Sequence, residues 1–384
     1  MRTGILGVAG TAVCLMACSD PTLTPTTGEA AFLHPSFSAA AQAACPAAAD
    51  FIVSTEDQLV SAIGSANPGA TIAVDGMIAV HADVIVSTPS ITLTCATPGS
   101  GLFAQAGAGV VVLLSVAAND VTVDRLSIDG GNAEDVFQAD GATGVRFTNN
   151  SVLCSPALNG GGCSLFNATP GAIVTGNRFQ SSGSFSGLHF QAGIDGARIE
   201  DNTITTTVAG ADVPIFGGLR VRDGVGVVIA RNTVRGPWQN SAAFADLDAS
   251  TIEQNVFEGA VVYGIRARSG GSFRTVSMTG NLVRANRISG AGSAGILLTS
   301  ACRNQLVGNL LEGNVGDVGL VFDAATGANV FAGNQNLLVD NGGALDCDGD
   351  GVGDPNIIGG PGLARRGGHG GPPDTADPAS NRRR

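Results

Sequence analysis

One asparagine-centred pattern recurs through the middle of the chain and constrains the fold more than any other feature. An apolar residue is followed by two variable residues, an asparagine, one variable residue and a second apolar residue, first as Phe147, Asn150 and Val152. Counted once per repeat, the asparagine returns every 23 to 30 residues. This near-constant period indicates a repeat protein in which each unit stacks on its neighbours. The series is Asn150, Asn177, Asn202, Asn232, Asn255, Asn281, Asn309 and Asn334, and Asn286 also fits the pattern.

A second pattern keeps phase with the first. Five short segments begin with glycine, alternate apolar with variable residues, and precede a pattern asparagine by a similar distance. Each repeat therefore has at least two short strands, and we expect glycine to open the turn before one of them. Because no helical pattern separates the strands, βαβ units are excluded and a parallel β-helix is predicted. The segments are GLHFQ (187–191), GLRVR (218–222), GIRAR (264–268), GILLT (295–299) and GLVFD (319–323).

The repeating asparagines are expected to be structural. Asparagine tolerates the left-handed backbone of a corner, and stacked amides can hydrogen-bond from one coil to the next. We therefore assign residues such as Asn232 to the scaffold of an all-β solenoid with roughly ten coils.

Composition supports this fold and excludes some functions. Glycine accounts for 56 of 384 residues, and aromatics for only 5%, so Val, Ile, Leu and Ala must form the core. The net charge of −12 argues against nucleic-acid binding, which needs a cationic surface. All 20 basic residues are arginine, which excludes chemistry that depends on lysine.

A helix is predicted where the folded part begins. Thr55 and Gln58 fit a capping box, Leu59 and Ile63 fall on one helical face with Ala66, and Asn-Pro-Gly at 67–69 ends the helix. This helix followed by short strands resembles the N-terminal end of right-handed parallel β-helices of the pectin-lyase-like superfamily. The resemblance covers about 50–360 and implies that the helix caps the open end of the solenoid. It does not imply an activity.

The two ends of the chain are predicted to lie outside the solenoid. Residues 1–18 form a short apolar signal, and its end, Leu15-Met16-Ala17-Cys18, resembles the lipobox of bacterial lipoproteins. That resemblance implies a lipidated Cys18 and a cell-envelope protein whose only membrane contact is the lipid anchor. Ser19 favours the outer membrane, and an ordinary secretory signal is the alternative. Residues 19–49 read as a Pro/Thr/Ala-rich tether and 361–384 as a disordered tail.

Six further cysteines suit disulfide bonds in an exported protein. Cys154 and Cys163 bracket a short loop, CSPALNGGGC, which favours their pairing. For the other four cysteines, we guess the pairs Cys45–Cys95 and Cys302–Cys347.

Arginines are predicted to share one solvent-facing side of the solenoid. In GLRVR, the alternation of a strand places Leu219 and Val221 in the core and Arg220 and Arg222 outside. Alignment by repeat phase extends this face in both directions. It would comprise His189 and Gln191, Arg220 and Arg222, Ala243 and Ala245, Arg266 and Arg268, Leu297 and Thr299, and Val321 and Asp323.

The arginine face suggests a polysaccharide partner. The two arginine pairs would lie about 10 Å apart, similar to two sugar units, and guanidinium groups bind carboxylates bidentately. We hypothesise that Arg220, Arg222, Arg266, Arg268 and His189 bind an anionic polysaccharide such as a uronan. Alternatively, the arginines are solvated and pair with acids such as Asp223 or Asp246, and the rod is a structural or adhesion scaffold.

Whether the chain is an enzyme is left open by the sequence. The pectin-lyase-like resemblance implies a possible polysaccharide lyase, with arginine as base and Ca²⁺ held by Asp223, Asp246 or Asp248. A glycoside hydrolase would need paired carboxylates. Asp246 and Asp248 would lie about 7 Å apart if both face outward on a strand.

One acidic stretch near the end, DCDGDGVGD at 346–354, resembles a calcium loop. Asp346, Asp348, Asp350 and Asp354 occupy positions 1, 3, 5 and 9 of the loop, with Gly351 at position 6, but Ile357 stands where an EF-hand has glutamate. The stretch is similar to thrombospondin-type calcium repeats. It is also similar to segments that close some β-helix proteins, including periplasmic accessory proteins of copper-enzyme maturation. Those usually carry an aromatic GNYW-like stretch, where this chain has GNQN at 333–336. We expect structural Ca²⁺ here; an acidic turn without metal is the alternative.

Overall fold

The fold was analysed in a computed structural model. The chain divides into two units, Met1–Ser38 and Ala39–Arg384, and all described residues belong to the second. Cys18 and most of the predicted tether and tail lie outside the described residues, so the domain boundaries remain predictions. The structure describes residues 44–46, 48–131, 133–154, 163–181, 186–208, 217–270, 278–314, 319–324, 326–341, 344–359 and 364–365.

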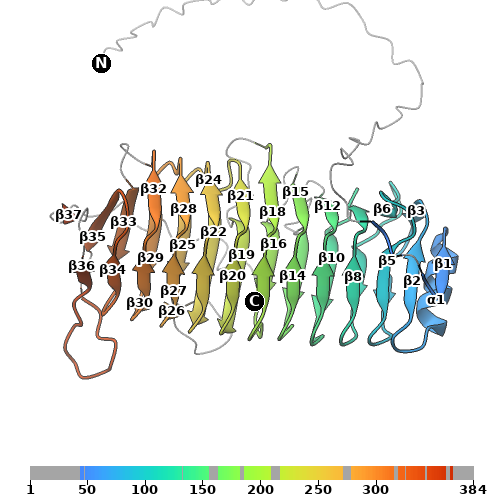
Figure 1. Ribbon diagram of the computed structural model, residues 1–384, viewed down its shortest axis with the longest axis horizontal. Coiled ribbons are helices and arrows are strands. Elements are labelled where there is room, and N and C mark those ends of the chain that lie inside the picture. Colours follow the sequence, from blue (N-terminus) through green and yellow to red (C-terminus); the bar gives the residue numbers. More distant parts are fainter. Residues whose placement is uncertain are drawn as a thin grey trace, which may run out of the picture. The chain divides into compact units, whose positions relative to one another are not determined.

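Three long parallel sheets form the walls of the second unit, and each strand pairs with the equivalent strand of the next coil (Figure 1). Sheet A has 13 strands: β1 (Phe51–Val53), β2 (Thr71–Val74), β5 (Thr92–Cys95), β8 (Thr122–Asp124), β11 (Arg146–Thr148), β14 (Ile173–Thr175), β17 (Arg198–Glu200), β20 (Val228–Ala230), β23 (Thr251–Glu253), β27 (Leu282–Arg284), β31 (Gln305–Val307), β34 (Val330–Ala332) and β36 (Ile357–Gly359).

The second wall is shorter. Sheet B has ten strands: β3 (Met77–Val80), β6 (Gly101–Ala104), β9 (Ser127–Asp129), β12 (Ser151–Cys154), β15 (Arg178–Ser181), β18 (Thr203–Thr206), β21 (Thr233–Arg235), β24 (Val256–Glu258), β28 (Arg287–Ser289) and β32 (Leu310–Glu312).

The third wall carries the predicted arginine face. Sheet C has 14 strands: β4 (Val84–Val86), β7 (Val112–Val116), β10 (Asp135–Asp140), β13 (Ser164–Asn167), β16 (Ser186–Gln191), β19 (Gly217–Val225), β22 (Asn240–Asp248), β25 (Tyr263–Arg268), β29 (Ala294–Thr299), β33 (Gly319–Ala324), β35 (Leu337–Asn341) and β37 (Ala364–Arg365), with β26 (Met278–Thr279) and β30 (Ala301–Cys302) beside them.

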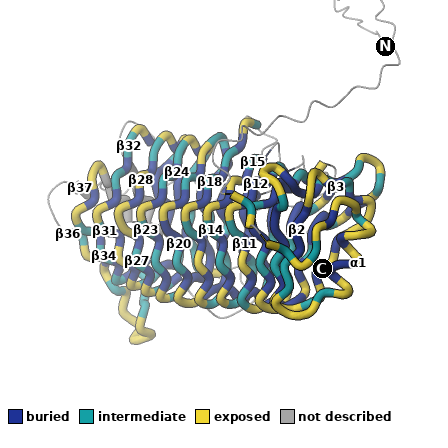
Figure 2. The backbone as a smooth tube through the Cα atoms, turned by 45° about the vertical axis from the view of Figure 1, so that its right-hand side comes forward, coloured by how far each residue is buried: buried dark blue, intermediate teal, exposed yellow. Residues whose placement is uncertain are grey.

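The predicted fold is confirmed. The chain visits the three sheets in turn, and the ten strands of sheet B correspond to ten coils that have all three walls. The rod is a right-handed parallel β-helix, the hand that strand–crossover–strand connections strongly prefer. Its interior is continuous and apolar, whereas many of the turn residues between strands are exposed (Figure 2).

The helix at the N-terminal end forms as its sequence predicts. It is α1 (Glu56–Ser65), where the Thr55 side chain accepts a hydrogen bond from the backbone N–H of Gln58. The Gln58 side chain accepts one in return from the backbone N–H of Ser54 at 2.9 Å. Leu59 and Ile63 are buried at the end of the solenoid. No helix among the described residues is long and apolar enough to span a membrane.

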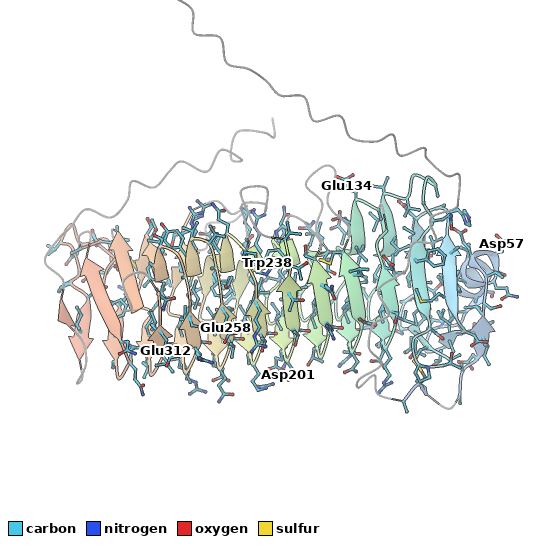
Figure 3. All side chains as sticks on the ribbon, turned by 90° about the horizontal axis from the view of Figure 1, so that it is seen from above. Asp57, Glu134, Asp201, Trp238, Glu258 and Glu312 are labelled. Carbon is cyan, nitrogen blue, oxygen red and sulfur yellow. A yellow bond between two sulfur atoms is a disulfide. The ribbon has the colours of Figure 1, made fainter. Side chains whose placement is uncertain are left out.

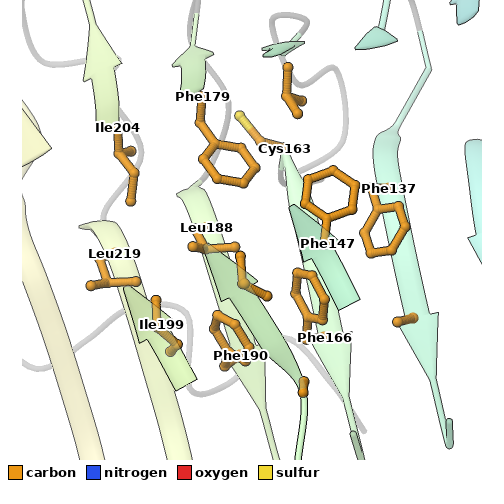
Figure 4. Close-up of a cluster of buried hydrophobic side chains, with 14 of the residues drawn as sticks. Phe137, Phe147, Cys163, Phe166, Phe179, Leu188, Phe190, Ile199, Ile204 and Leu219 are labelled. Carbon is orange, nitrogen blue, oxygen red and sulfur yellow. The ribbon is translucent and has the colours of Figure 1, made fainter. Parts of the chain in front are cut away.

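Matching apolar residues form the core in stacked columns. In sheet A, Ile199 pairs with Ile229, which pairs with Ile252. Aromatic rings stack in the same way between coils: the Phe166 and Phe190 centroids lie 4.7 Å apart with their planes 13° apart (Figure 4). The strand register therefore brings apolar side chains of equivalent positions together along the axis.

An uninterrupted amide ladder runs along the corner between sheets A and B. The Oδ1 of Asn232 accepts hydrogen bonds from the backbone N–H and the Nδ2 of Asn202, at 3.1 and 2.9 Å. Its Nδ2 donates to Asn255 Oδ1 at 3.0 Å and to the Ile199 carbonyl at 2.8 Å. The ladder comprises Asn150, Asn177, Asn202, Asn232, Asn255, Asn286, Asn309 and Asn334.

The structure corrects the predicted series at Asn281. Asn255 bonds to Asn286, and Asn281 begins a second ladder at the corner between sheets C and A. The left-handed residue at each corner is not the asparagine but its predecessor, such as Arg231 with φ 56°. The asparagines therefore recur in phase because of their hydrogen bonds rather than their backbone conformation. The second ladder comprises Asn281, Asn304, Asn329 and Asn356.

The repeated glycines of sheet C are also corrected. They lie within the strands instead of opening turns. At Gly218, an added Cβ would overlap the side chain of Val234 and lie 2.9 Å from Nε1 of the buried Trp238. The glycine is needed because the facing apolar column approaches too closely for any side chain. Gly187, Gly264 and Gly295 face Ile204, Ile288 and Leu311 in the same way.

All three predicted disulfides are present in the structure. Cys154 pairs with Cys163, with 4.9 Å between their Cα atoms. Cys45 pairs with Cys95, and Cys302 with Cys347. The last two bonds hold segments near the N-terminal and C-terminal ends of the solenoid to its walls.

The ladder generates a stability prediction. Asn232→Ala should leave the buried N–H of Asn202 without its partner and remove the amide donor to the Ile199 carbonyl, and such losses cost about 1–3 kcal/mol each. We expect the free energy of unfolding, measured with denaturant, to fall by at least about 2 kcal/mol. Asn167→Ala is the matched control, because Asn167 is half-buried and hydrogen-bonds Asp140. An equal effect of both substitutions would contradict the ladder's role.

Candidate functional site

The outer face of sheet C brings the predicted arginines together. Arg220 of β19 pairs in register with Ala243 of β22, which pairs with Arg266 of β25. Two residues further along each strand, Arg222, Ala245 and Arg268 repeat the arrangement. The sequence-based alignment of these three coils is confirmed. We call the surface formed by these six residues the arginine groove.

The arginine groove is a pocket because its middle coil carries small side chains. The two alanines lie between the arginine pairs, and Asn240 and Phe244 complete the lining. The four arginines are half-buried, which limits the solvent screening of their charges. One coil step is about 4.8 Å, so the arginine pairs are about 9.6 Å apart. The site therefore concentrates four positive charges on a protein whose net charge is −12.

His189 extends the same face but differs in environment. It pairs in register with Arg220 and with Leu165 of the preceding coil. Its side chain is 9% exposed, and its Nε2 is buried without a hydrogen-bond partner. Burial, followed by the positive charges of Arg220 and Arg222, lowers the pKa of His189 well below its usual value. At neutral pH the imidazole is therefore uncharged and adds no cation to the groove.

The predicted outer face ends at the next coils. Leu297 and Thr299 of β29 are in register with Arg266 and Arg268. The expected continuation through Val321 and Asp323 is wrong by one residue, because Leu297 pairs with Phe322.

The aspartates proposed as calcium ligands of a lyase or as acids of a hydrolase do not line the arginine groove. Asp223 and Asp246 follow Arg222 and Ala245 at equivalent places, with φ of 56° and 53°, and both are completely buried. Left-handed residues interrupt the alternation of the strand. The outward-facing arrangement of Asp246 and Asp248 is therefore wrong. Asp246 Oδ1 instead accepts a hydrogen bond from the backbone N–H of Gly270 at 2.7 Å.

The acidic loop near the C-terminal end brings three carboxylates together. Asp346, Asp348 and Asp354 each offer an oxygen atom, and these atoms lie within 4.8 Å of one another. Hydrogen bonds from the backbone N–H groups of Gly351 and Gly349 lower the pKa of Asp346. Asp350, also predicted as a ligand, is not in this group.

Other arginines form ion pairs away from sheet C. Arg231 binds Asp201 through Nε at 2.8 Å, and Arg235 binds Glu258 at 2.7 Å. The labelled acids Asp201, Glu258 and Glu312 lie along one side of the rod in Figure 3. These exposed pairs connect neighbouring coils, and each contributes about 0–1 kcal/mol.

The coils, corners and capping helix define a right-handed parallel β-helix whose outer face carries a cluster of arginines. The model of one family, described as "Periplasmic copper-binding protein (NosD)", matches residues 143–363, more than half of the chain. The chain belongs to the NosD family. No curated protein matches it.

Solved structures confirm the architecture. The A-module of mannuronan C-5 epimerase AlgE4 from Azotobacter vinelandii aligns with a TM-score of 0.60 at 14% identity, covering 83% of this chain and 100% of that one. DFA-IIIase from Arthrobacter chlorophenolicus A6 aligns at 0.54 and 15% identity, covering 79% and 92%. The Dettilon tailspike protein aligns at 0.54 and 12% identity, covering 79% of this chain and only 64% of the tailspike. At these identities the likeness establishes the fold alone.

The environment of His189 predicts a pH dependence. The unfolded chain binds a proton at this residue with a pKa of about 6.5, whereas the folded chain resists protonation. Lowering the pH below about 6.5 should therefore favour unfolding by up to about 1.4 kcal/mol per pH unit, until the folded pKa is reached. Denaturant titrations between pH 7 and pH 5 should show a smaller loss for His189→Gln than for the wild type. Identical pH profiles would contradict this environment.

Proposed function

We propose that this protein binds an anionic polysaccharide in the cell envelope through the arginine groove. The observation that carries the proposal is the convergence of four half-buried arginines around Ala243 and Ala245. The coil scaffold needs only apolar residues inside, so outward arginines at matching positions on two coils call for another explanation. Guanidinium groups bind carboxylates through two parallel hydrogen bonds, which suits acidic sugars.

The comparisons support an envelope location and a glycan partner. The family description contains the word periplasmic, which agrees with the signal predicted at residues 1–18. Among proteins of similar fold, one is named for its action on mannuronan. Lipidation at Cys18 and an outer-membrane position remain proposals from the sequence.

Copper, named in the family description, does not fit the described residues. Copper sites use soft thiolate or thioether ligands and imidazoles. The two described methionines, Met77 of β3 and Met278 of β26, lie on different coils. All six cysteines after the predicted signal are in disulfides. Of the two described histidines, His81 pairs with Glu56 at 2.9 Å and His189 is buried. The function proposed for the described residues therefore does not include copper.

Binding is favoured over catalysis. Among the described residues, the one group of three or more His, Cys, Asp or Glu side chains that converge is the C-terminal acidic loop. A lyase with groove-bound Ca²⁺ would need acidic ligands beside the arginines and a hydrolase would need paired acids there, whereas the residues that line the arginine groove include no carboxylate. The proposed function requires only that the arginine groove bind the polysaccharide.

The groove makes a binding prediction. Replacing Arg220 and Arg266 together by alanine should weaken binding to an acidic polysaccharide at least about tenfold, because two charge-assisted contacts worth about 1.5–3 kcal/mol each are lost. Arg235→Ala with Arg287→Ala removes the same charge from exposed positions of sheet B and should have little effect. Calorimetry against a uronan panel provides the measurement, and absorbance of unsaturated products in the same samples would reveal a lyase. Unchanged binding in the groove variant would overturn the proposal and favour the structural or adhesion scaffold.

We further propose that the acidic loop binds Ca²⁺ and stabilises the C-terminal end of the rod. Carboxylates at these positions are typical calcium ligands, and the Cys302–Cys347 bond already fixes this loop to the wall. Calcium at 100 times its dissociation constant should add about 2.7 kcal/mol to the free energy of unfolding.

The calcium proposal is tested by thermal melting. The melting temperature should rise with Ca²⁺ and return to its starting value with a chelator. Asp346→Asn should abolish the rise, whereas Asp57→Asn on the surface of α1 should retain it. A chain that melts identically with Ca²⁺ and with chelator would have an acidic turn without metal.

A further inference from the structure

The positive charges of the arginine groove are unevenly spaced along the solenoid axis. Arg220 and Arg222 lie on β19, and Arg266 and Arg268 lie on β25, two coils further on. The coil between them, β22, offers only the methyl groups of its alanines at these positions. Cations are therefore separated by about 9.6 Å, and the coil at half that distance carries none in these two columns.

The coils on either side of the groove are also uncharged in the same two columns. Towards the N-terminus, β16 presents His189, which its surroundings hold neutral, and Gln191. Towards the C-terminus, β29 presents Leu297 and Thr299. On the described strands, these two columns therefore carry positive charge on β19 and β25 and none on β16, β22 and β29.

Within each charged step, the two arginines can act on one anion. They are two residues apart on a strand, about 6.6 Å between Cα atoms, and both side chains leave the same face. Long guanidinium side chains converge over that distance and can grip one carboxylate together. An anion above the alanines receives no guanidinium from its own coil.

We infer that the arginine groove recognises glycans whose carboxylates recur once in every two sugar units, with an uncharged sugar above Ala243 and Ala245. This inference rests on the proposed function and adds the spacing of charge on the ligand. The glycan chain would run along the solenoid axis, because only in that direction do the arginine pairs lie two sugar units apart. Strand register thus sets specificity as well as fold.

The test compares two hexasaccharides of equal length at one ionic strength. One alternates a uronate with an uncharged N-acetylated sugar, and the other is an oligomannuronate with a carboxylate on every unit. We expect dissociation constants within about threefold, since the additional carboxylates lack partners in the groove. Binding of the oligomannuronate more than about tenfold tighter would show that only charge density matters, and would overturn the inference while the proposed function stands. Failure of both ligands to bind would overturn the proposed function itself.

A substitution in the middle coil sharpens this comparison. Ala243→Arg adds a cation at the uncharged step, so it should strengthen oligomannuronate binding by up to about fivefold and leave the alternating ligand unimproved. Ala243→Gln is the matched control, because it fills the same place without charge. Circular dichroism and melting of both variants verify that the solenoid is intact. Equal gains for both ligands with Ala243→Arg would contradict the spacing.

Discussion

Hydrogen bonding between stacked coils is the constraint on which the rest of this structure depends. A solenoid coil cannot bury its own apolar residues, so each coil must match the next in register. Two amide ladders enforce that match at the corners of sheet A, and each interior asparagine bonds both neighbours. Their amides are buried, so a slipped coil would leave several polar groups without partners at once. Register is therefore specified repeatedly along the rod.

Once register is fixed, the outer face becomes available for function. An outward residue affects neither the core nor the ladders, so its identity can vary from coil to coil. Arginine occurs at matching outward positions on β19 and β25, and alanine occurs between them. The proposed glycan site consists of this pattern on an otherwise regular wall.

Much of this arrangement was predictable because a β-helix repeats two simple rules. Period-two alternation placed Leu219 in the core and Arg220 outside, and the asparagine phase aligned Arg220 with Arg266 two coils away. The short loop that Cys154 and Cys163 bracket favours their pairing, whereas nothing in the sequence singles out the other two disulfides that the structure contains. Other features depend on contacts between coils, which a linear pattern does not display. The need for glycine at 218 comes from Val234 and Trp238, which lie later in the chain.

The errors have specific physical causes. Asn281 and Asn286 fit one sequence pattern, but they occupy different corners because both corners use the same hydrogen-bonding device. Asp246 would face outward only on a regular strand, but its own left-handed backbone breaks the alternation there and its side chain is buried. Burial of His189 was not evident either, since alternation predicts the side of a strand and not what covers it.

The most direct test of the central claim is a crystal structure of the protein with an acidic tetrasaccharide. We expect the glycan to lie along the solenoid axis on sheet C, with carboxylates hydrogen-bonded to Arg220 or Arg222 at one step and to Arg266 or Arg268 at the other. A glycan bound across the axis, or bound elsewhere with these four side chains unengaged, would contradict it.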